Sequence, residues 1–405
     1  MAAALSDIRV AAFTHFAAGP IAAQYLGALG ADVIKVESPQ QDINRYALRH
    51  PDGLLQGISP YFLAINRNQR CLGLDLKSTE GLKVAQDLIA QSDVVIENYR
   101  PGVMERLQLG YEHAKALNPK IVYCSLSAYD PIGPARDRPG QDLLLQALSG
   151  LASLTGRGGG PPIPVGAYII DGFTAMQGVT GILAALRYRD QHGAGQWVRA
   201  DMMSSALFLM SQEASYILNA DPNPERSRDG IAHVNQSAPY GVYETKDGPI
   251  AISTFGGVPM VRKLAQALKI LDTIEPYLNE HDLRFRRDEV ARHISDALIK
   301  FTKQEAIALI EPTGTWAVAV RSLADALEEP AVVASGIVKT FDADYGGAHR
   351  IVVEPLKMTE TPIIADRPAP GHGEHSREVL KEIGYSDTKI DQLIAAAATF
   401  ESKAP

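Results

Sequence analysis

One carboxylate in this sequence lies where it could act as a reactive group. Asp171 follows the apolar segment Val165-Gly-Ala-Tyr-Ile-Ile, and a helical pattern begins at Asp171 and continues to about Arg187. Free backbone N–H groups at a helix start keep a carboxylate ionised and can stabilise a developing oxyanion, so Asp171 could serve as a nucleophile. Aspartate is also a favoured helix N-cap, worth about 1 kcal/mol, and the position alone favours that capping role.

Basic side chains recur where predicted strands end. Lys77 follows one strand, Arg100 and Arg106 follow another, and Arg136 and Arg138 lie in the next loop. Because parallel strands place their carboxyl ends on one edge of a sheet, we expect Lys77, Arg100 and Arg106 to converge. Such a cluster suits a ligand with several phosphates and an aromatic base, although each residue alone could be a solvated surface charge.

The elements that would position these residues form an α/β pattern. The first 130 residues alternate short apolar strands with helical segments, which is typical of βαβ units and a doubly wound, mainly parallel sheet. We predict strands at residues 9–14, 33–36, 72–76, 94–97, 121–126 and 197–201. We predict helices at residues 20–29, 78–89, 112–117, 141–154, 171–187 and 203–218.

A change of composition at Asp221-Pro-Asn-Pro-Glu predicts a linker to a second, smaller domain. The alternating runs 240–244 and 249–253, joined through Lys246-Asp247-Gly248, indicate a hairpin. Gly256-Gly257 precedes a mostly helical stretch over 261–312. A β-rich segment near residue 345 and a last helix over 376–383 complete the prediction.

Composition excludes several classes of protein. The net charge of −8 argues against nucleic-acid binding. We found no membrane-spanning segment, no secretion signal and no metal-ligand spacing, and Cys71 and Cys124 have no CxxC partners, so we expect a cytoplasmic protein. The segment His15-Phe-Ala-Ala-Gly-Pro does not match the GxGxxG motif of dinucleotide binding. The sequence therefore lacks the main feature that would predict a dehydrogenase. No GxSxG motif or Cys-His arrangement supports acyl chemistry by serine or cysteine.

Several segments together resemble the family III coenzyme A transferases, the group that contains formyl-CoA transferase and carnitine CoA-transferase. The similarity extends over nearly the whole chain, and the order and spacing of the segments carry it. These segments are Thr14-His-Phe-Ala-Ala-Gly-Pro, Leu26-Gly-Ala-Leu-Gly-Ala-Asp-Val-Ile-Lys-Val-Glu37, Asn66-Arg-Asn-Gln-Arg, Leu74-Asp-Leu-Lys77, Glu97-Asn-Tyr-Arg-Pro-Gly102, Gln146-Ala-Leu-Ser-Gly150, the segment ending at Asp171, Gly181-Ile-Leu-Ala-Ala-Leu and Gly195-Gln-Trp-Val.

The resemblance implies a Rossmann-like large domain built from both ends of the chain. The expected division is residues 1–220 for the large CoA-binding domain, 221–330 for a small α+β domain, and 331–405 for a segment that returns to the large domain. It also implies an interlocked homodimer. Coenzyme A enters as a thioester substrate, with no tightly bound cofactor. The implied coenzyme A contacts are His15, Phe16, Ala17, Ala18, Lys35, Leu72, Leu74, Asp75, Lys77, Asn98, Tyr99, Arg100, Arg106 and Arg138.

In this family the aspartate at the position of Asp171 is the nucleophile. It forms an aspartyl anhydride with the donor acyl group and then an aspartyl-CoA thioester, before the acceptor carboxylate reverses the steps. The acceptor is expected to be a small acid such as a dicarboxylate, near Gln141, Tyr168 and Tyr240. The glycine loop that shields intermediates in formyl-CoA transferase corresponds to Gly256-Gly257, which is a shorter glycine run here.

Two alternatives stay open on the sequence alone. An α-methylacyl-CoA racemase shares the resemblance, but its histidine would fall at Gln141, directly before Asp142. An amide cannot act as a proton-transfer base near neutral pH, so Gln141 favours transfer over racemisation. A non-catalytic CoA-binding protein is the alternative of another class.

Overall fold

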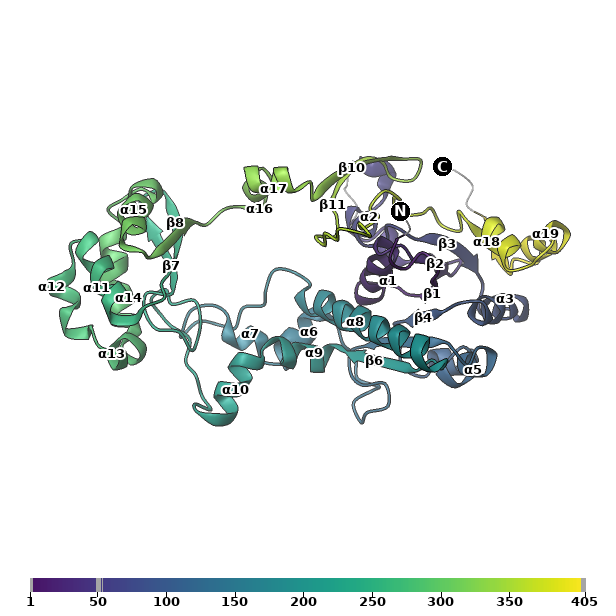
Figure 1. Ribbon diagram of the computed structural model, residues 1–405, viewed down its shortest axis with the longest axis horizontal. Coiled ribbons are helices and arrows are strands. Elements are labelled where there is room, and N and C mark those ends of the chain that lie inside the picture. Colours follow the sequence, from purple (N-terminus) through teal and green to yellow (C-terminus); the bar gives the residue numbers. More distant parts are fainter. Residues whose placement is uncertain (1–2, 49–51, 53, 402–405) are drawn as a thin grey trace. The chain divides into compact units, whose positions relative to one another are not determined.

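The computed structural model describes residues 3–48, 52 and 54–401 of the chain (Figure 1). These residues divide into two compact units. Unit 1 comprises Met1–Leu145, Tyr168–Ala206 and Pro330–Pro405, and unit 2 comprises Gln146–Ala167 and Leu207–Glu329. The predicted division was at 220/221 and 330/331, whereas residues 146–167 and 207–220 group with unit 2 and Pro330 groups with unit 1.

A seven-stranded sheet forms the centre of unit 1. In spatial order its strands are β12 (Thr399–Phe400), β3 (Arg70–Leu74), β2 (Asp32–Glu37), β1 (Arg9–Phe13), β4 (Val94–Glu97), β5 (Val122–Ser127) and β6 (Trp197–Asp201). All neighbours pair in parallel except β12, which pairs antiparallel with β3. The chain winds outward from β1 to β3 and then returns to β4 on the other side of β1. The gap between β1 and β4 is therefore the topological switch point, where open α/β sheets bind ligands.

Helices cover both faces of this sheet, as the doubly wound prediction requires. One apolar cluster joins the sheet to α1 (Ala18–Ala28) and α8 (Ile169–His192). The other joins it to α3 (Thr79–Ala90), α5 (Tyr111–Leu117), α18 (Ser376–Glu382) and α19 (Asp387–Ala395). Neighbouring residues of one strand belong to opposite clusters, such as Val10 and Ala11 in β1, because side chains alternate across a sheet.

The helix that carries Asp171 is long and apolar. Among the described residues, α8 is the one helix whose length and composition would suffice to cross a membrane. One side of α8 packs against α1, β5 and β6, and Ile170, Val179 and Ile182 are buried there. A core helix of a sheet protein passes the same test of length and composition, so this feature by itself does not indicate a membrane span.

A hairpin completes unit 1. Strands β10 (Val338–Ala343) and β11 (Gly347–Val352) pair antiparallel and pack on α2 (Pro60–Ile65) through Phe62, Leu63, Phe341 and Ile351. The β-rich segment expected near residue 345 is therefore confirmed as this hairpin. Two short helices also belong to this unit, α4 (Val103–Arg106) and α17 (Pro330–Ser335).

Unit 2 contains a three-stranded antiparallel sheet in the order β7 (Gly241–Thr245), β8 (Gly248–Ser253) and β9 (Trp316–Ala319). The predicted hairpin is confirmed as β7 and β8, and β9 adds a strand that the sequence analysis did not predict. One face of the sheet packs on an apolar cluster with helices. The helices of the segment from 257 to 327 are α11 (Gly257–Ala267), α12 (Leu271–Ile274), α13 (Glu280–Phe285), α14 (Arg287–Leu298), α15 (Lys303–Ile310) and α16 (Leu323–Leu327).

Three predicted helices differ from the structure. The helix over 141–154 is divided into α6 (Asp142–Leu148) and α7 (Leu151–Leu154), because Gly150 adopts the left-handed region with φ of 92°. The helix over 203–218 is divided at Met210 into α9 (Met202–Leu209) and α10 (Ser211–Asn219). The helix at 376 is followed by α19 and the edge strand β12, so it is not the last element.

Candidate active site

Asp171 lies in the first turn of α8 but does not cap it. The helix begins two residues earlier at Ile169, and Tyr168 is the N-cap residue. The Asp142 carboxylate, at the start of α6, accepts hydrogen bonds from the backbone N–H groups of Ile170 at 2.8 Å and Asp171 at 3.0 Å. The prediction that Asp171 caps its own helix was wrong, since Asp142 performs that task and leaves the Asp171 carboxylate for other contacts.

The surroundings of Asp171 change its acidity. Burial and, to a smaller extent, the negative charge of Asp142 raise the pKa of its carboxyl to about 7, while a hydrogen bond from the Ala18 N–H acts in the opposite direction. Ala18 is the first residue of α1, so the starts of two helices meet at this carboxylate. A carboxylate with a raised pKa is more basic and less solvated than an ordinary surface aspartate, and both properties favour nucleophilic attack.

The turn between β1 and α1 holds Ala18 in place. Phe16 in this turn has φ of 58°, in the left-handed region, which costs a non-glycine residue roughly 1 to 2 kcal/mol. Its ring is 50% exposed, whereas Ala17 and Ala18 are buried. Burial lowers the pKa of His15 to about 4, so its imidazole is neutral near pH 7.

The same turn contacts the loop after β4 across the switch point. The His15 N–H donates to Asn98 Oδ1 at 2.9 Å, and Asn98 Nδ2 donates to the His15 carbonyl at 2.7 Å. The imidazole of His15 stacks on the Tyr99 ring with centroids 5.0 Å apart. The structure therefore brings together predicted site residues from two segments that are more than 80 positions apart.

Exposed cations lie at this carboxyl edge of the sheet. Lys77, Arg100, Arg106 and Arg138 are all exposed. A Cβ at Gly102 would lie 3.2 Å from Arg106 Nη1 and 3.6 Å from Arg136 Nη2, so these two guanidinium groups approach the same point. Two like charges at one place favour an anionic ligand such as a phosphate. Asp75, another predicted coenzyme A contact, accepts a hydrogen bond from the Lys77 N–H at 3.0 Å.

Three predicted coenzyme A contacts have side chains that face the protein interior. Leu72 and Leu74 are fully buried in the sheet core. The Lys35 side chain is 0% exposed, and its ammonium donates to the Thr14 carbonyl at 2.8 Å and pairs with Asp42 at 3.0 Å. In this structure the Lys35 charge is balanced inside the fold by Asp42, and its expected contact with coenzyme A stays a prediction.

Aromatic rings lie close to Asp171. Tyr168 is 54% exposed, and its ring centroid lies 5.4 Å from that of Tyr61 on α2. Burial raises the pKa of Tyr61, and the charge of Asp171 raises it further, which places the Tyr61 hydroxyl near that carboxylate as a neutral group. Gln141 is exposed directly before α6. The sequence analysis did not name Tyr61 or Asp142 as site residues, because their closeness to Asp171 comes from contacts in the fold.

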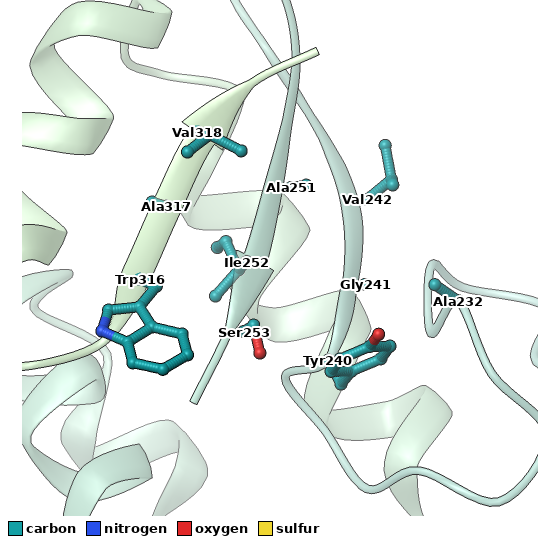
Figure 2. Close-up of a pocket in the computed structure, with 10 residues that line it drawn as sticks. All are labelled: Ala232, Tyr240, Gly241, Val242, Ala251, Ile252, Ser253, Trp316, Ala317 and Val318. Carbon is teal, nitrogen blue, oxygen red and sulfur yellow. The ribbon is translucent and has the colours of Figure 1, made fainter. Parts of the chain in front are cut away.

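The remaining predicted site residues belong to unit 2. Tyr240 is half-buried and lines a cavity of about 360 Å³ on the exposed face of the three-stranded sheet, shared with Trp316 and Val318 (Figure 2). Gly256 and Gly257 form the start of α11 with φ of 131° and 56°. A Cβ at Gly256 would lie 2.5 Å from Met260 Cγ of the same helix, and a Cβ at Gly257 would lie 2.6 Å from Glu280 Oε1 of α13.

Fold and site together define a class of protein. An α/β sheet with a polar switch point, basic side chains at its carboxyl edge and a desolvated carboxylate is suited to a phosphate-bearing ligand and to acyl chemistry on that carboxylate. Within the described residues, no group of three or more His, Cys, Asp or Glu side chains could hold a metal ion.

Comparison with known proteins identifies the family. The sequence model described as CoA-transferase family III matches residues 5–376, and the chain belongs to this family. It is therefore an enzyme of the CoA-transferase type, with CoA thioesters as substrates. The resemblance stated from the sequence is confirmed.

Several curated relatives are transferases of dicarboxylate CoA esters by name. The chain is 33% identical over 388 residues to a succinate–glutarate CoA-transferase of Agrobacterium fabrum, covering 94% of this chain and 95% of that protein. It is 30% identical to a human succinyl-CoA:glutarate CoA-transferase, covering 97% and 89%. It is 33% identical to a succinyl-CoA:mesaconate CoA-transferase of Haloarcula hispanica, covering 94% and 96%.

A solved structure supports the same fold. A CAIB/BAIF family protein from Brucella suis superposes with a TM-score of 0.81 at 28% identity, covering 95% of this chain and all of that one. The mixed α/β fold with a mainly parallel central sheet is thus shared with this solved protein.

Proposed function

We propose that this enzyme transfers coenzyme A from a dicarboxylic acyl-CoA, such as succinyl-CoA, to a second small dicarboxylate. The names of the relatives from Agrobacterium, human and Haloarcula support this substrate class. The observation that carries the chemical part of the proposal is the Asp171 carboxylate, desolvated at the start of α8 and contacted by the Ala18 N–H.

The reaction would proceed through Asp171 in two covalent stages. A carboxylate oxygen of Asp171 attacks the thioester carbonyl, the carbon–sulfur bond breaks, and the CoA thiolate leaves behind an aspartyl anhydride. The thiolate then attacks the Asp171 carbonyl carbon, which releases the donor acid and forms an aspartyl-CoA thioester. The acceptor carboxylate attacks that thioester, and the same two steps in reverse yield the new acyl-CoA and free Asp171.

The chain's own residues contribute positioning and electrostatics to these steps. Removal of water raises the basicity of Asp171, and the Ala18 N–H at the start of α1 interacts with the negative charge of its carboxylate. The exposed Arg106 and Arg136 would hold phosphates of coenzyme A, which fixes the thioester without altering its reactivity.

The first experiment replaces the nucleophile. Asp171→Ala should lower transfer from succinyl-CoA to glutarate by at least about a thousandfold, while coenzyme A still binds, because the carboxylate is consumed in every covalent step. The matched control is Asp190→Ala, which removes an exposed carboxylate near the other end of the same helix. Wild-type activity in the Asp171→Ala enzyme would refute the nucleophile.

The second part of the test traps the intermediate. Incubation of the wild-type enzyme with succinyl-CoA, followed by borohydride or hydroxylamine, should modify Asp171 in the peptide that contains it, as read by mass spectrometry. A panel of glutarate, mesaconate, malate, oxalate and acetate as acceptors then tests the substrate class. A marked preference for acetate or another monocarboxylate would contradict transfer to dicarboxylates, whatever the outcome at Asp171.

A further inference from the structure

The turn that presents Ala18 to Asp171 is held by side chains from other segments. Three successive carbonyls of this turn, those of Thr14, His15 and Phe16, each accept a hydrogen bond from a side chain. Their donors are Lys35 Nζ at 2.8 Å, Asn98 Nδ2 at 2.7 Å and Asn44 Nδ2 at 2.5 Å. The backbone of the turn is thus fixed from β2, from the loop after β4 and from the short 3₁₀ helix Ile43–Arg45.

Two of these donors are linked to each other by one buried carboxylate. Asp42 Oδ2 accepts from Lys35 Nζ at 3.0 Å, and Asp42 Oδ1 accepts from the Asn44 N–H at 3.0 Å. Asp42 is itself held by its N–H, which donates to Glu37 Oε1 at 2.7 Å. Lys35, Asp42 and Asn44 are all buried. Burying a pair of charges costs free energy unless the hydrogen bonds of both groups are complete. Here Lys35 donates to the turn itself, and Asp42 binds Asn44, which also donates to the turn.

The held conformation is one that the turn would not adopt freely. Phe16 lies at φ of 58°, which a residue with a side chain rarely adopts unless its surroundings impose it. The Asn44 side chain bonds the carbonyl of this same residue. Two residues later, the Ala18 N–H reaches the Asp171 carboxylate. Loosening Phe16 would therefore move the donor that Asp171 uses.

We propose that Asn44, supported by Asp42 and Lys35, is a positioning residue for the nucleophile. By binding the Phe16 carbonyl it keeps the Ala18 N–H directed at Asp171, and so sets how readily that carboxylate ionises and reacts. This role rests on the proposed function of Asp171, and it assigns Lys35 to the turn rather than to coenzyme A.

The test is Asn44→Ala, which removes the donor to Phe16. The rate of adduct formation with saturating succinyl-CoA should fall about tenfold, as expected for one lost hydrogen bond in a positioned site. Because the Ala18 N–H lowers the pKa of Asp171, its displacement should also shift the acidic limb of the transfer rate to higher pH. Asn44→Gln keeps an amide donor and should recover part of both effects.

A matched control separates positioning from general stability. Asn118→Ala removes another amide that donates to a backbone carbonyl, that of Ser92 at 2.8 Å, beyond the opposite ends of the strands, and should change neither rate nor pH profile. If Asn44→Ala does not fold, Asn44→Leu preserves the volume without the donor and must show the same upward shift. A wild-type pH profile in a folded variant without the donor would overturn the positioning role. The absence of any adduct on wild-type Asp171 would instead refute the nucleophile.

Discussion

At the scale of single residues, the site depends on how two carboxylates divide their tasks. Asp142 is buried and accepts two backbone N–H bonds, which suit a charged carboxylate. Asp171 has fewer such partners and lies beside that charge, so its pKa rises to about 7, with burial as the larger cause. Under the proposed function, Asp142 supports the start of α8 and Asp171 reacts with substrate.

The charge of Asp142 can be tested through the pH dependence of the reaction. Asp171 must be ionised to attack, so kcat/KM of the wild-type enzyme should fall about tenfold per unit below pH 7. Asp142→Asn keeps an oxygen that can accept from the N–H groups of Ile170 and Asp171 but removes the negative charge. The acidic limb of the kcat/KM profile should therefore move to lower pH, with a reduced plateau because Asp171 becomes a weaker base.

The direction in which the acidic limb of kcat/KM moves in Asp142→Asn tests whether the charge of Asp142 acts on Asp171. An unchanged limb would mean that Asp142 acts only as a helix cap, and a limb displaced to higher pH would contradict the electrostatic argument. The variant Asp137→Asn, which neutralises an exposed carboxylate in the loop with Arg136, serves as the control and should leave the limb in place.

Site prediction from the sequence is most direct where a residue stands in a motif. Asp171 was singled out because a segment of recognisable type ends at it, and the contacts of Asn98 with the His15 turn agree with the expectation that strand ends converge. The inward direction of the Lys35 side chain could not be predicted, because it depends on the ion pair with Asp42, seven residues later. Such pairing is set by the tertiary fold, which spacing along the chain does not show.

At the scale of elements, the close approach of α1 to its neighbours explains one glycine of the family segment. A Cβ at Gly27 would lie 2.3 Å from the Asn68 carbonyl oxygen, a backbone atom that cannot move alone. Gly27→Ala should therefore destabilise the protein by roughly 1 to 3 kcal/mol, as overpacking does, despite the better helix propensity of alanine. The measurement is the midpoint of urea unfolding.

A second helical glycine provides the control for this prediction. A Cβ at Gly172, in the first turn of α8, would meet no atom within 4 Å. Gly172→Ala should raise the free energy of unfolding by about 0.5 to 1 kcal/mol through helix propensity alone. Equal effects of the two substitutions would contradict the packing argument for Gly27.

Element prediction was accurate where local signals were complete. The strands Val94–Glu97 and Trp197–Asp201 have the predicted bounds, and Ser78 caps α3 by accepting from the Gly81 N–H, as predicted. The antiparallel edge strand β12 was missed because it has only two residues and is defined by pairing with β3. The break at Gly150 was missed because a glycine within a helical pattern can either be tolerated or end the helix.

At the scale of the whole molecule, the chain exposes large apolar side chains on several helices. They include Leu143, Leu144 and Leu148 on α6, Leu183 and Tyr188 on α8, Leu207 and Phe208 on α9, and Ile217 and Leu218 on α10. Soluble monomers seldom expose so many large apolar side chains on consecutive helices, and such surfaces are commonly covered by a partner. We propose that a second copy of this chain is that partner, as in the homodimer expected from the family resemblance.

An interlocked homodimer makes a prediction that an ordinary dimer does not. Its protomers cannot separate without opening the fold, so a mixture of tagged and untagged dimers should form no heterodimers over days in buffer, and should form them after unfolding and refolding together. Sedimentation should give twice the mass of one chain, independent of concentration. Phe208→Glu, which places a charge on an exposed apolar side chain of α9, should lower the yield of refolded dimer because it would bury an unpaired charge. Rapid exchange of tagged and untagged protomers in buffer would contradict the interlocked arrangement but not the dimer. A monomeric mass with full activity would contradict the dimer as well.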